Sequence, residues 1–216
     1  MGTARPAATV VVVRPGPDDD GAASPAGIEV LVLRRSPDAG FVPGFVVFPG
    51  GSVDPPDRAL AAAWFGTPAE EARACALREL AEEAGLVATA SRILEARGRL
   101  PGEPGLPPPA AHQMPQIGHW IAPEFLPVRF DARFYALAAD REASPTPDGV
   151  EVDRAWWATP ADLLRAQRLG RIPLAWPTLT TLEALSGCAT VAAALALRVE
   201  QVAPPPAAPF AQPSSP

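Results

Sequence analysis

The chain has 216 residues, a formal net charge of −6 and 48% hydrophobic residues. A chain of this length and composition can bury one hydrophobic core, so a single domain is expected. The negative charge argues against a nucleic-acid partner held by bulk positive charge, and no segment approaches the roughly 18 apolar residues of a membrane span. The N-terminus lacks an apolar signal-peptide core, which predicts a cytoplasmic protein without a membrane partner.

The N-terminal part of the chain alternates β-branched segments with turn residues. Residues 7–13 and 28–34 are predicted strands, and a turn-rich loop joins them. An acidic triplet at residues 18–20 lies in this loop, where solvated turn residues are the expected interpretation. A short buried strand is predicted over residues 45–48.

A glycine pair and a helix start come next. Gly50 and Gly51 follow the short strand, and glycines at this point allow the backbone to approach a ligand closely. Further along, Thr67 has the properties of an N-cap, Pro68 suits the first helical position, and Glu70 suits the third. A new helix is therefore predicted to begin at Pro68.

This helix carries an acidic face. At about 100° per residue, Glu79, Glu82 and Glu83 lie on one side of the helix, while leucines and alanines occupy the opposite side. Carboxylates spaced by three and four residues repel one another unless a cation compensates them. Arg78 precedes Glu82 by four residues, so it can pair with that carboxylate and orient it. The pattern favours a divalent metal ion.

These residues resemble the signature of the Nudix hydrolases. The signature begins with a glycine, here Gly51, and ends with Arg-Glu, an aliphatic residue, any residue, Glu-Glu, any residue, glycine and an aliphatic residue, here residues 78–86. The resemblance implies an α/β fold, a Nudix-type α/β/α sandwich with a mixed central sheet. It also implies Mg²⁺ or Mn²⁺ as a cofactor.

The first acid of the signature departs from the family pattern. The family has a glutamate six positions after the glycine, and this chain has Asp57. An insertion, residues 58–70, follows it before Arg78. We expect the insertion to be mainly a loop, with a short helix over residues 58–66 that packs beside the site.

A second resemblance concerns the substrate. Arg35, Ser36, Gly44 and the Phe-Pro-Gly-Gly turn fall at intervals similar to a motif of the coenzyme A diphosphatases of the Nudix family. The motif expects threonine where Leu33 stands and arginine where Gly40 stands. The insertion inside the signature is similar to the branch whose better-known members cleave acyl-coenzyme A.

The rest of the chain completes the predicted fold. Further strands are predicted over residues 92–100, 116–121, 129–138 and 154–158. Further helices are predicted over residues 160–169, 178–186 and 189–202. We therefore expect one Nudix domain over residues 1–202, with the signature at 51–86, and a disordered Pro/Ala-rich tail over residues 203–216.

The resemblance assigns roles to individual residues. Glu79 and Glu83 are the expected principal metal ligands, with Glu82 close behind, and the carbonyl oxygen of Gly51 is a further candidate. The predicted catalytic residues are the three glutamates together with Arg78. The candidate substrate-binding residues are Arg34, Arg35, Ser36, Gly50, Arg129 and Arg133. For the arginines, solvent-exposed charge at strand edges is the alternative interpretation.

Two acids have weaker assignments. Asp57 either replaces the signature glutamate or has no role in the site. Glu151 lies in a loop that often supplies an additional acid in this family, so it is a candidate base or ligand and otherwise a surface charge.

Three functions remain open. The first is hydrolysis of coenzyme A or acyl-coenzyme A to adenosine 3′,5′-bisphosphate and a phosphopantetheine. The second is a Nudix pyrophosphatase acting on nucleotide sugars or nucleoside triphosphates, which Gly40 favours. The third is a noncatalytic ligand-binding module, which the Asp57 substitution and the interrupted signature favour. The expected partner is a small diphosphate molecule, and the oligomeric state is left open, with a homodimer among the alternatives.

Overall fold

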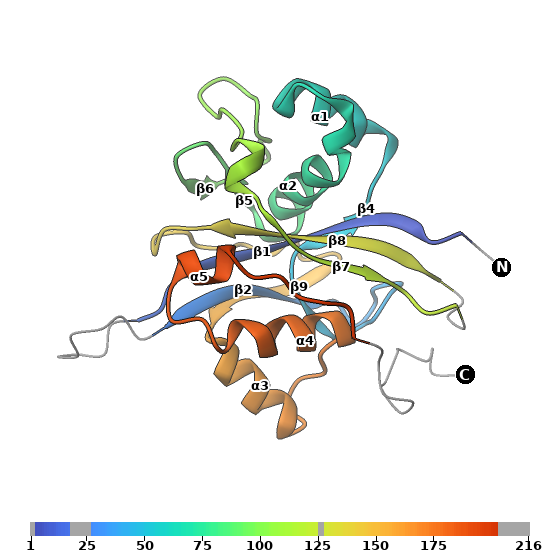
Figure 1. Ribbon diagram of the computed structural model, residues 1–216, viewed down its shortest axis with the longest axis vertical. Helices are drawn as coiled ribbons and strands as arrows, with labels where there is room; N and C mark the ends of the chain where they lie inside the picture. The colour runs from blue at the N-terminus through green and yellow to red at the C-terminus, as the bar shows by residue number, and fades with distance from the viewer. Residues whose placement is uncertain (1–2, 18–26, 125–127, 203–216) are drawn as a thin grey trace.

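The protein is described by a computed structural model over residues 3–17, 27–124 and 128–202. The acidic triplet at residues 18–20 and the predicted tail lie outside these ranges. Helices cover both faces of a central sheet, so the described chain has three layers (Figure 1). This arrangement confirms the predicted α/β/α sandwich.

Within the described residues, the central sheet has seven strands of mixed direction. They are β1 (Arg5–Pro15), β2 (Ile28–Arg35), β3 (Val46–Val47), β4 (Gly50–Ser52), β7 (Gln116–Ile121), β8 (Phe130–Ala138) and β9 (Val152–Ala158). The main order is β3-β2-β1-β8-β7, in which β1 and β8 run parallel. One edge of β1 pairs with β8, and two strands share the other edge. On that edge the C-terminal residues of β1 pair with β2, and its N-terminal residues pair with β4. This sharing brings the glycine pair into the middle of the sheet.

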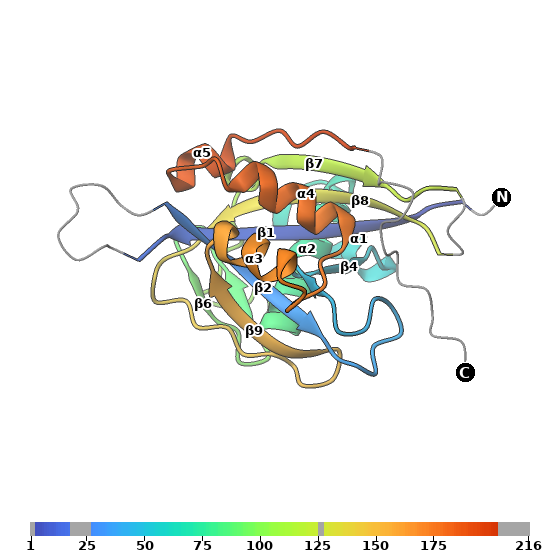
Figure 2. The same cartoon turned by 90° about the horizontal axis from the view of Figure 1, so that it is seen from below.

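The helices divide into two groups. α1 (Pro55–Phe65) and α2 (Glu71–Ala84) lie on one side of the sheet, and α2 packs directly on β1. The other face is covered by α3 (Pro160–Arg168), α4 (Trp176–Leu185) and α5 (Val191–Leu195), as Figure 2 shows from below. No helix in the described part of the chain is both long and apolar enough to span a membrane.

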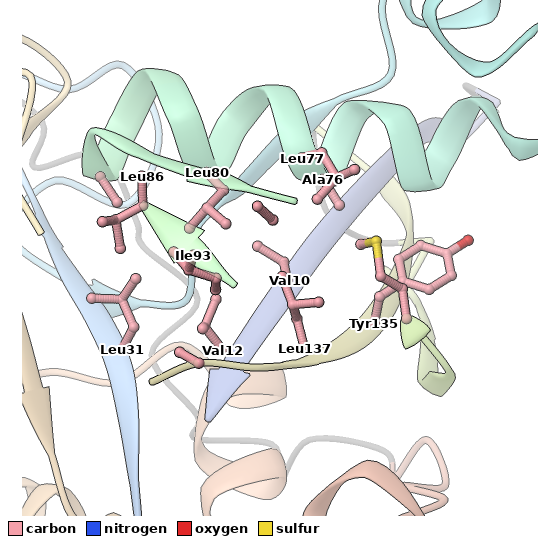
Figure 3. Packing of buried hydrophobic residues seen from close by; sticks show 14 of the residues in the cluster. Val10, Val12, Leu31, Ala76, Leu77, Leu80, Leu86, Ile93, Tyr135 and Leu137 are labelled. Atoms are coloured by element: carbon pink, nitrogen blue, oxygen red, sulfur yellow. The ribbon is translucent and has the colours of Figure 1, made fainter. Parts of the chain in front are cut away.

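Alternation along β1 creates a core on each face. Val10 and Val12 face α2, whereas the valines that alternate with them face the opposite helical layer. Leu77 and Leu80 of α2 meet these side chains in the core of the first face, beside Leu137 of β8 (Figure 3). Each fully buried leucine contributes about 2 kcal/mol through the area it removes from water. This packing anchors α2, so its acidic face is held in a defined position.

The insertion differs from the prediction. It is mainly helical instead of mainly a loop. The helix predicted over residues 58–66 is present as the 11-residue helix α1, which begins three residues earlier. Two prolines occupy its first turn, and the backbone N–H of Asp54 donates to the Asp57 carboxylate at 2.8 Å. Gly66 ends the helix with a positive φ of 73°. The earlier start makes Asp57 a helical residue.

The start of the signature helix agrees with the prediction. The Thr67 side chain accepts a hydrogen bond from the Ala69 backbone N–H at 3.3 Å. Its first turn is a 3₁₀ helix, η1 (Pro68–Glu70), which continues into α2. Gly85, with φ 64°, ends α2.

The segment after α2 is less regular than expected. The predicted strand over residues 92–100 is a short hairpin strand, β6 (Ile93–Glu95), paired with β5 (Leu86–Ala88) outside the central sheet. Arg97 and Gly98 have φ of 50° and 75°, which ends the extended conformation. Further along lie a second 3₁₀ turn, η2 (Ala111–Gln113), and β7.

The predicted helix over residues 189–202 is also wrong in length, because α5 ends at Leu195. Beyond it, the Val199 backbone N–H donates to the Ile117 carbonyl oxygen at 2.6 Å, alongside β7. Tertiary pairing with the sheet therefore replaces the last turns of the helix.

Candidate active site

The glycine pair lies directly against the acidic face of α2. A Cβ atom at Gly51 would come within 2.4 Å of Glu79 Oε1, and one at Gly50 would come within 2.4 Å of the Ala8 carbonyl oxygen. Side chains at these positions would clash with the backbone of β1 or the carboxylate of α2. At Gly50 the neighbour is backbone, so only glycine permits the approach, whereas a side chain at Gly51 would displace the Glu79 carboxylate.

Glu83 is a buried carboxyl group at this turn. Only 3% of the residue is exposed, and its Oε2 accepts a hydrogen bond from the Gly50 backbone N–H at 2.9 Å. Burial is the main reason why the pKa of Glu83 is raised to about 8; the nearby Glu79 carboxylate adds to the rise, while the Gly50 N–H and the Arg35 guanidinium oppose it. A cation at this position would favour the ionised form.

Glu79 is the second buried carboxyl group. Burial raises its pKa to about 7, against the opposing effect of Arg78. Glu82 and Glu151 are further acids whose charges raise the Glu79 pKa. Two such carboxyl groups beside one glycine pair form a site of unusual proton affinity, which is typical of functional clefts. We refer to Glu79, Glu82 and Glu83 as the acidic cluster.

Arg78 links the acidic cluster to the inserted helix. Its Nη1 donates to Glu79 Oε1 and to Glu82 Oε2, each at 2.8 Å. Its Nε and Nη2 donate to the two carboxylate oxygens of Asp57 at 2.8 and 3.0 Å. The hydrogen bonds to Asp57 are the main reason why the pKa of Arg78 is raised. The predicted Arg78–Glu82 pair is thus present, and Arg78 orients carboxylates rather than facing solvent.

Asp57 is fully buried, with no exposed surface. One oxygen accepts from Arg78 alone, and the other accepts from Arg78 and from the Asp54 backbone N–H. In the described structure Asp57 therefore binds Arg78 and the first turn of α1, and it contacts the acidic cluster only through Arg78.

Arg35 approaches the acidic cluster from the end of β2. Its Nη1 contacts Glu83 Oε1 and its Nη2 contacts Glu151 Oε2, both at 3.4 Å. The Arg35 Nε donates to the Phe41 carbonyl oxygen at 2.9 Å. Glu151 has an exposed side chain, and its backbone is held by Asp148, whose carboxylate accepts from three N–H groups of residues 150–152. The structure therefore brings Arg35 and Glu151 to the cluster.

Ser36 and Arg34 make other contacts. The Ser36 hydroxyl accepts from the Asp38 backbone N–H at 3.3 Å, which stabilises a local turn. Arg34 projects to the opposite face from Arg35, because side chains alternate along β2, and it makes a two-point ion pair with Asp153 at 2.7 and 2.8 Å. The structure does not bring Arg34 to the acidic cluster.

The two arginines near β8 also lie apart from it. Arg129 Nε donates to the Ala122 carbonyl oxygen at 3.0 Å. Arg133 is exposed on β8 and lines a small hollow with Asp131 and Glu71, beside the first turn of α2. The acidic cluster belongs to the later turns of the same helix.

Cys75 is a neighbour of the site that the sequence interpretation treated as a plain core thiol. Its Sγ donates to the Ser52 carbonyl oxygen at 3.2 Å and lies 3.6 Å from that of Gly51. Burial raises the pKa of this thiol. The sequence contains a signal that Cys75 lies near the site. Cys75 precedes Arg78 by three residues and Glu79 by four, which places the three residues on the same face of α2.

The donor groups suit a hard divalent cation by their chemistry. Carboxylate oxygens from one helical face and a backbone carbonyl are the ligands that Mg²⁺ and Mn²⁺ prefer. Within the described residues, no group of three or more His, Cys, Asp or Glu side chains is arranged to hold a metal ion as it stands. Arg35 and Arg78 instead neutralise oxygens of the acidic cluster. The residue types therefore fit the cation by their chemistry.

Comparison with known proteins identifies the family. Residues 4–176 match the family model described as the NUDIX domain. The crystal structure of a NUDIX hydrolase from Alicyclobacillus acidocaldarius is 30% identical to this chain, with a TM-score of 0.74 over 92% of this chain and 99% of that one. The NUDIX domain of Shewanella oneidensis NrtR, solved with ADP ribose, has a TM-score of 0.52 at 16% identity, covering 85% of this chain and 86% of that one, and shows the shared fold.

A curated relative extends beyond the match. "Putative nudix hydrolase 7" of Caenorhabditis elegans is 27% identical over 180 residues, which cover 73% of this chain and 55% of that protein. The present chain thus spans about half the length of this relative. The family-model match covers most of the chain, and the Alicyclobacillus structure matches it over nearly its whole length. The chain belongs to the Nudix hydrolase family.

Proposed function

We propose that the protein hydrolyses the diphosphate linkage of a small molecule with the help of Mg²⁺ or Mn²⁺. The observation that carries this proposal is the meeting of the Glu79 and Glu83 carboxyl groups with the Gly50–Gly51 turn in a Nudix fold. Cleavage of a diphosphate requires neutralisation of its oxygens and an activated water. A metal ion bound by these carboxyl groups would meet both requirements.

The acidic cluster and the Gly51 carbonyl oxygen would hold the metal ion. When bound, the ion would neutralise phosphate oxygens and lower the pKa of a bound water. Arg78 would keep Glu79 and Glu82 oriented, as it does in the described structure. Arg35 would exchange its long 3.4 Å contacts to the carboxylates for a substrate phosphate, because a guanidinium group binds phosphate through two parallel hydrogen bonds.

Glu151 is the candidate for the general base. Its side chain is exposed and contacts Arg35, which also contacts Glu83, so it can accept a proton from a water and release it to solvent. Glu83 is an alternative base, because burial places its pKa close to neutral pH.

Coenzyme A or acyl-coenzyme A is the substrate that we favour. Support comes from the upstream motif, in which Arg35 reaches the acidic cluster and Ser36 closes the turn behind it. The products would be adenosine 3′,5′-bisphosphate and a phosphopantetheine. A nucleotide sugar or nucleoside triphosphate is the alternative, because Gly40 is exposed where the coenzyme A motif has arginine, and no atom lies within 4 Å of its Cβ position. A cytoplasmic location is part of this proposal.

Product analysis tests these proposals. Purified protein with Mg²⁺ or Mn²⁺ would be assayed on coenzyme A, acyl-coenzyme A, NADH, ADP-ribose, nucleotide sugars and nucleoside triphosphates, with Glu83→Gln as the inactive control. Release of adenosine 3′,5′-bisphosphate by the native protein alone is the expected result. Preference for another compound would replace the substrate and keep the reaction. Absence of turnover across the panel, with binding retained, would favour a noncatalytic module.

A further inference from the structure

The loop between β8 and β9 carries Glu151 toward the acidic cluster, and the last part of this loop is open to solvent. Residues 148–151 are all exposed, and Val150 is 76% exposed. Apolar packing therefore does not hold this end of the loop. The position of Glu151 relative to Arg35 depends on hydrogen bonds instead.

The middle of the loop is anchored on β9 and on the end of α2. The Trp157 indole N–H donates to the Ala143 carbonyl oxygen at 2.7 Å. The Thr146 backbone N–H donates to the carbonyl oxygen of Ala84, the last residue of α2, at 2.8 Å. A Cβ atom at Gly85 would come within 2.9 Å of the Thr146 carbonyl oxygen, so glycine at this position also permits the loop to dock. The loop thus reaches its exposed end from a fixed point beside the signature helix.

Asp148 binds the backbone of the exposed end. Its Oδ1 accepts from the N–H groups of Val150 and Val152 at 3.0 and 2.9 Å, and its Oδ2 accepts from the Glu151 N–H at 3.3 Å. Gly149 has φ of 74°, which lets the chain turn sharply between Asp148 and its partners. One carboxylate therefore pairs with three consecutive backbone donors, and Glu151 is the central one.

The same turn is joined to β2 beside the acidic cluster. The Glu151 carbonyl oxygen accepts from the Ser36 backbone N–H at 2.8 Å. The Glu151 carboxylate contacts Arg35 Nη2 at 3.4 Å, and Arg35 Nη1 contacts Glu83 at the same distance. A change in the shape of the turn would therefore move the Glu151 carboxylate relative to Arg35 and Glu83.

We propose that Asp148 is a positioning residue, which holds Glu151 where it can act as the general base. This inference rests on the function proposed above. In that reaction Glu151 takes a proton from a water, the water oxygen forms a bond to phosphorus, and the bridging oxygen leaves with the electrons of its broken bond. A base must lie within hydrogen-bond reach of the water, and a misplacement of about 1 Å can lower the rate by a factor of about 100. Asp148 acts through its hydrogen bonds to the turn and not through contact with the substrate.

Steady-state kinetics on the purified chain with Mg²⁺ test the proposal. The substrate would be coenzyme A, or the compound of the panel above that the native chain hydrolyses fastest. The variants are Asp148→Ala, Asp148→Asn, Glu151→Gln and the double variant Asp148→Ala with Glu151→Gln. Asp140→Ala is the matched control, because Asp140 is another exposed acid of the same loop. Thermal melting would establish that each variant is folded.

We expect Asp148→Ala to lower kcat about tenfold and to change KM by less than about twofold. Asp148→Asn should retain most of the activity, because an amide oxygen in the place of Oδ1 still accepts from residues 150 and 152. In the Glu151→Gln background, Asp148→Ala should cause no further loss, because the base that it positions is absent. Asp140→Ala should match the native chain. Amide hydrogen exchange at residues 150–152 should become faster in Asp148→Ala alone among the single alanine variants.

Other outcomes would overturn the proposal. Native-like kcat in Asp148→Ala would reject the positioning role and leave the hydrolase function intact. Equal losses in Asp148→Ala and Asp148→Asn would show an effect of charge and not of position. An equal fold-loss in the presence and absence of the Glu151 carboxylate would mean that Asp148 does not act through Glu151. Native-like kcat in Glu151→Gln would assign the base to another group and reject this inference, whereas absence of hydrolysis by the native chain across the panel would reject the proposed function itself.

Discussion

Asp57 and Arg78 form a two-point ion pair that joins the inserted helix α1 to the signature helix α2, with N–O distances of 2.8 and 3.0 Å. The two residues lie 21 positions apart in the chain. Arg78 in turn contacts Glu79 and Glu82. The insertion therefore supports the acidic cluster through one buried carboxylate.

Replacing Asp57 should affect both stability and the site. In Asp57→Asn, the largely buried Arg78 loses its fully buried charged partner and keeps Glu79 and Glu82. Removal of one partner from a buried pair costs up to about 3–5 kcal/mol. Urea denaturation would measure the loss, and kcat should fall because Arg78, which orients Glu79 and Glu82, is itself held less firmly. Asp54→Asn is the matched control, since Asp54 is exposed and asparagine is an equally good N-cap. Equal stability of the two variants would contradict the assigned role.

The unfolding free energy of the metal-free protein should fall as the pH rises from about 5 to about 8. The pKa values of Glu79 and Glu83 are raised to about 7 and about 8 from an ordinary value of 4.5. The folded state therefore binds more protons than the unfolded state in this range, and its advantage is complete below pH 4.5 and lost above pH 8. The slope can reach about 1.4 kcal/mol per pH unit for each carboxyl group.

Urea denaturation in EDTA at several pH values would measure this slope. Glu83→Gln should reduce it, because the amide does not titrate, and saturating Mg²⁺ should flatten it by favouring the ionised carboxylates. An unfolding free energy that is constant or rises over this pH range would show that the two groups are not buried as described.

Neighbouring arginines on β2 should behave differently. Arg35→Ala removes the guanidinium group that would bind a substrate phosphate, and hydrogen bonds of charged groups are worth about 1.5–3 kcal/mol, so kcat/KM should fall about 10- to 100-fold. Arg34→Ala breaks an exposed pair with Asp153 on the other face, and should change stability by less than about 1 kcal/mol. Steady-state kinetics would measure kcat/KM for the two variants. Similar losses of kcat/KM in both would contradict the assignment of Arg35 to the site and of Arg34 to the opposite face of the sheet.

The two cysteines should differ in reactivity. Cys75 is fully buried and its thiol pKa is raised by burial and by the charges of Asp57 and Glu79, so the reactive thiolate is scarce. Cys188 is partly exposed. N-ethylmaleimide should therefore label Cys188 in the native protein and both residues after denaturation, as detected by mass spectrometry. Cys188→Ala provides the control, and rapid native labelling of that variant would mean that the site around Ser52 opens readily.

Local signals in the sequence were sufficient for the signature helix. Thr67, Pro68 and Gly85 define its ends through capping chemistry, and the spacing of Glu79 and Glu83 places both on one face. These features depend on neighbours within one or two turns, so a single sequence contains them. The mixed sheet and its covering helices followed from the same local patterns and from the family resemblance.

Long-range contacts decided the remainder. The sequence interpretation predicted the inserted helix but placed its start three residues too late. It left Asp57 without a clear role, because its partner Arg78 lies on another helix. The helix predicted after residue 189 ended early because Val199 pairs with β7. Arg34 and Arg35 are equivalent in composition, and only the strand's alternation within the folded sheet separates them. The sequence thus determined most of the helices and strands and the acidic face of α2. Tertiary packing determined which side chains contact that acidic face, because burial and pairing between distant residues depend on the complete fold.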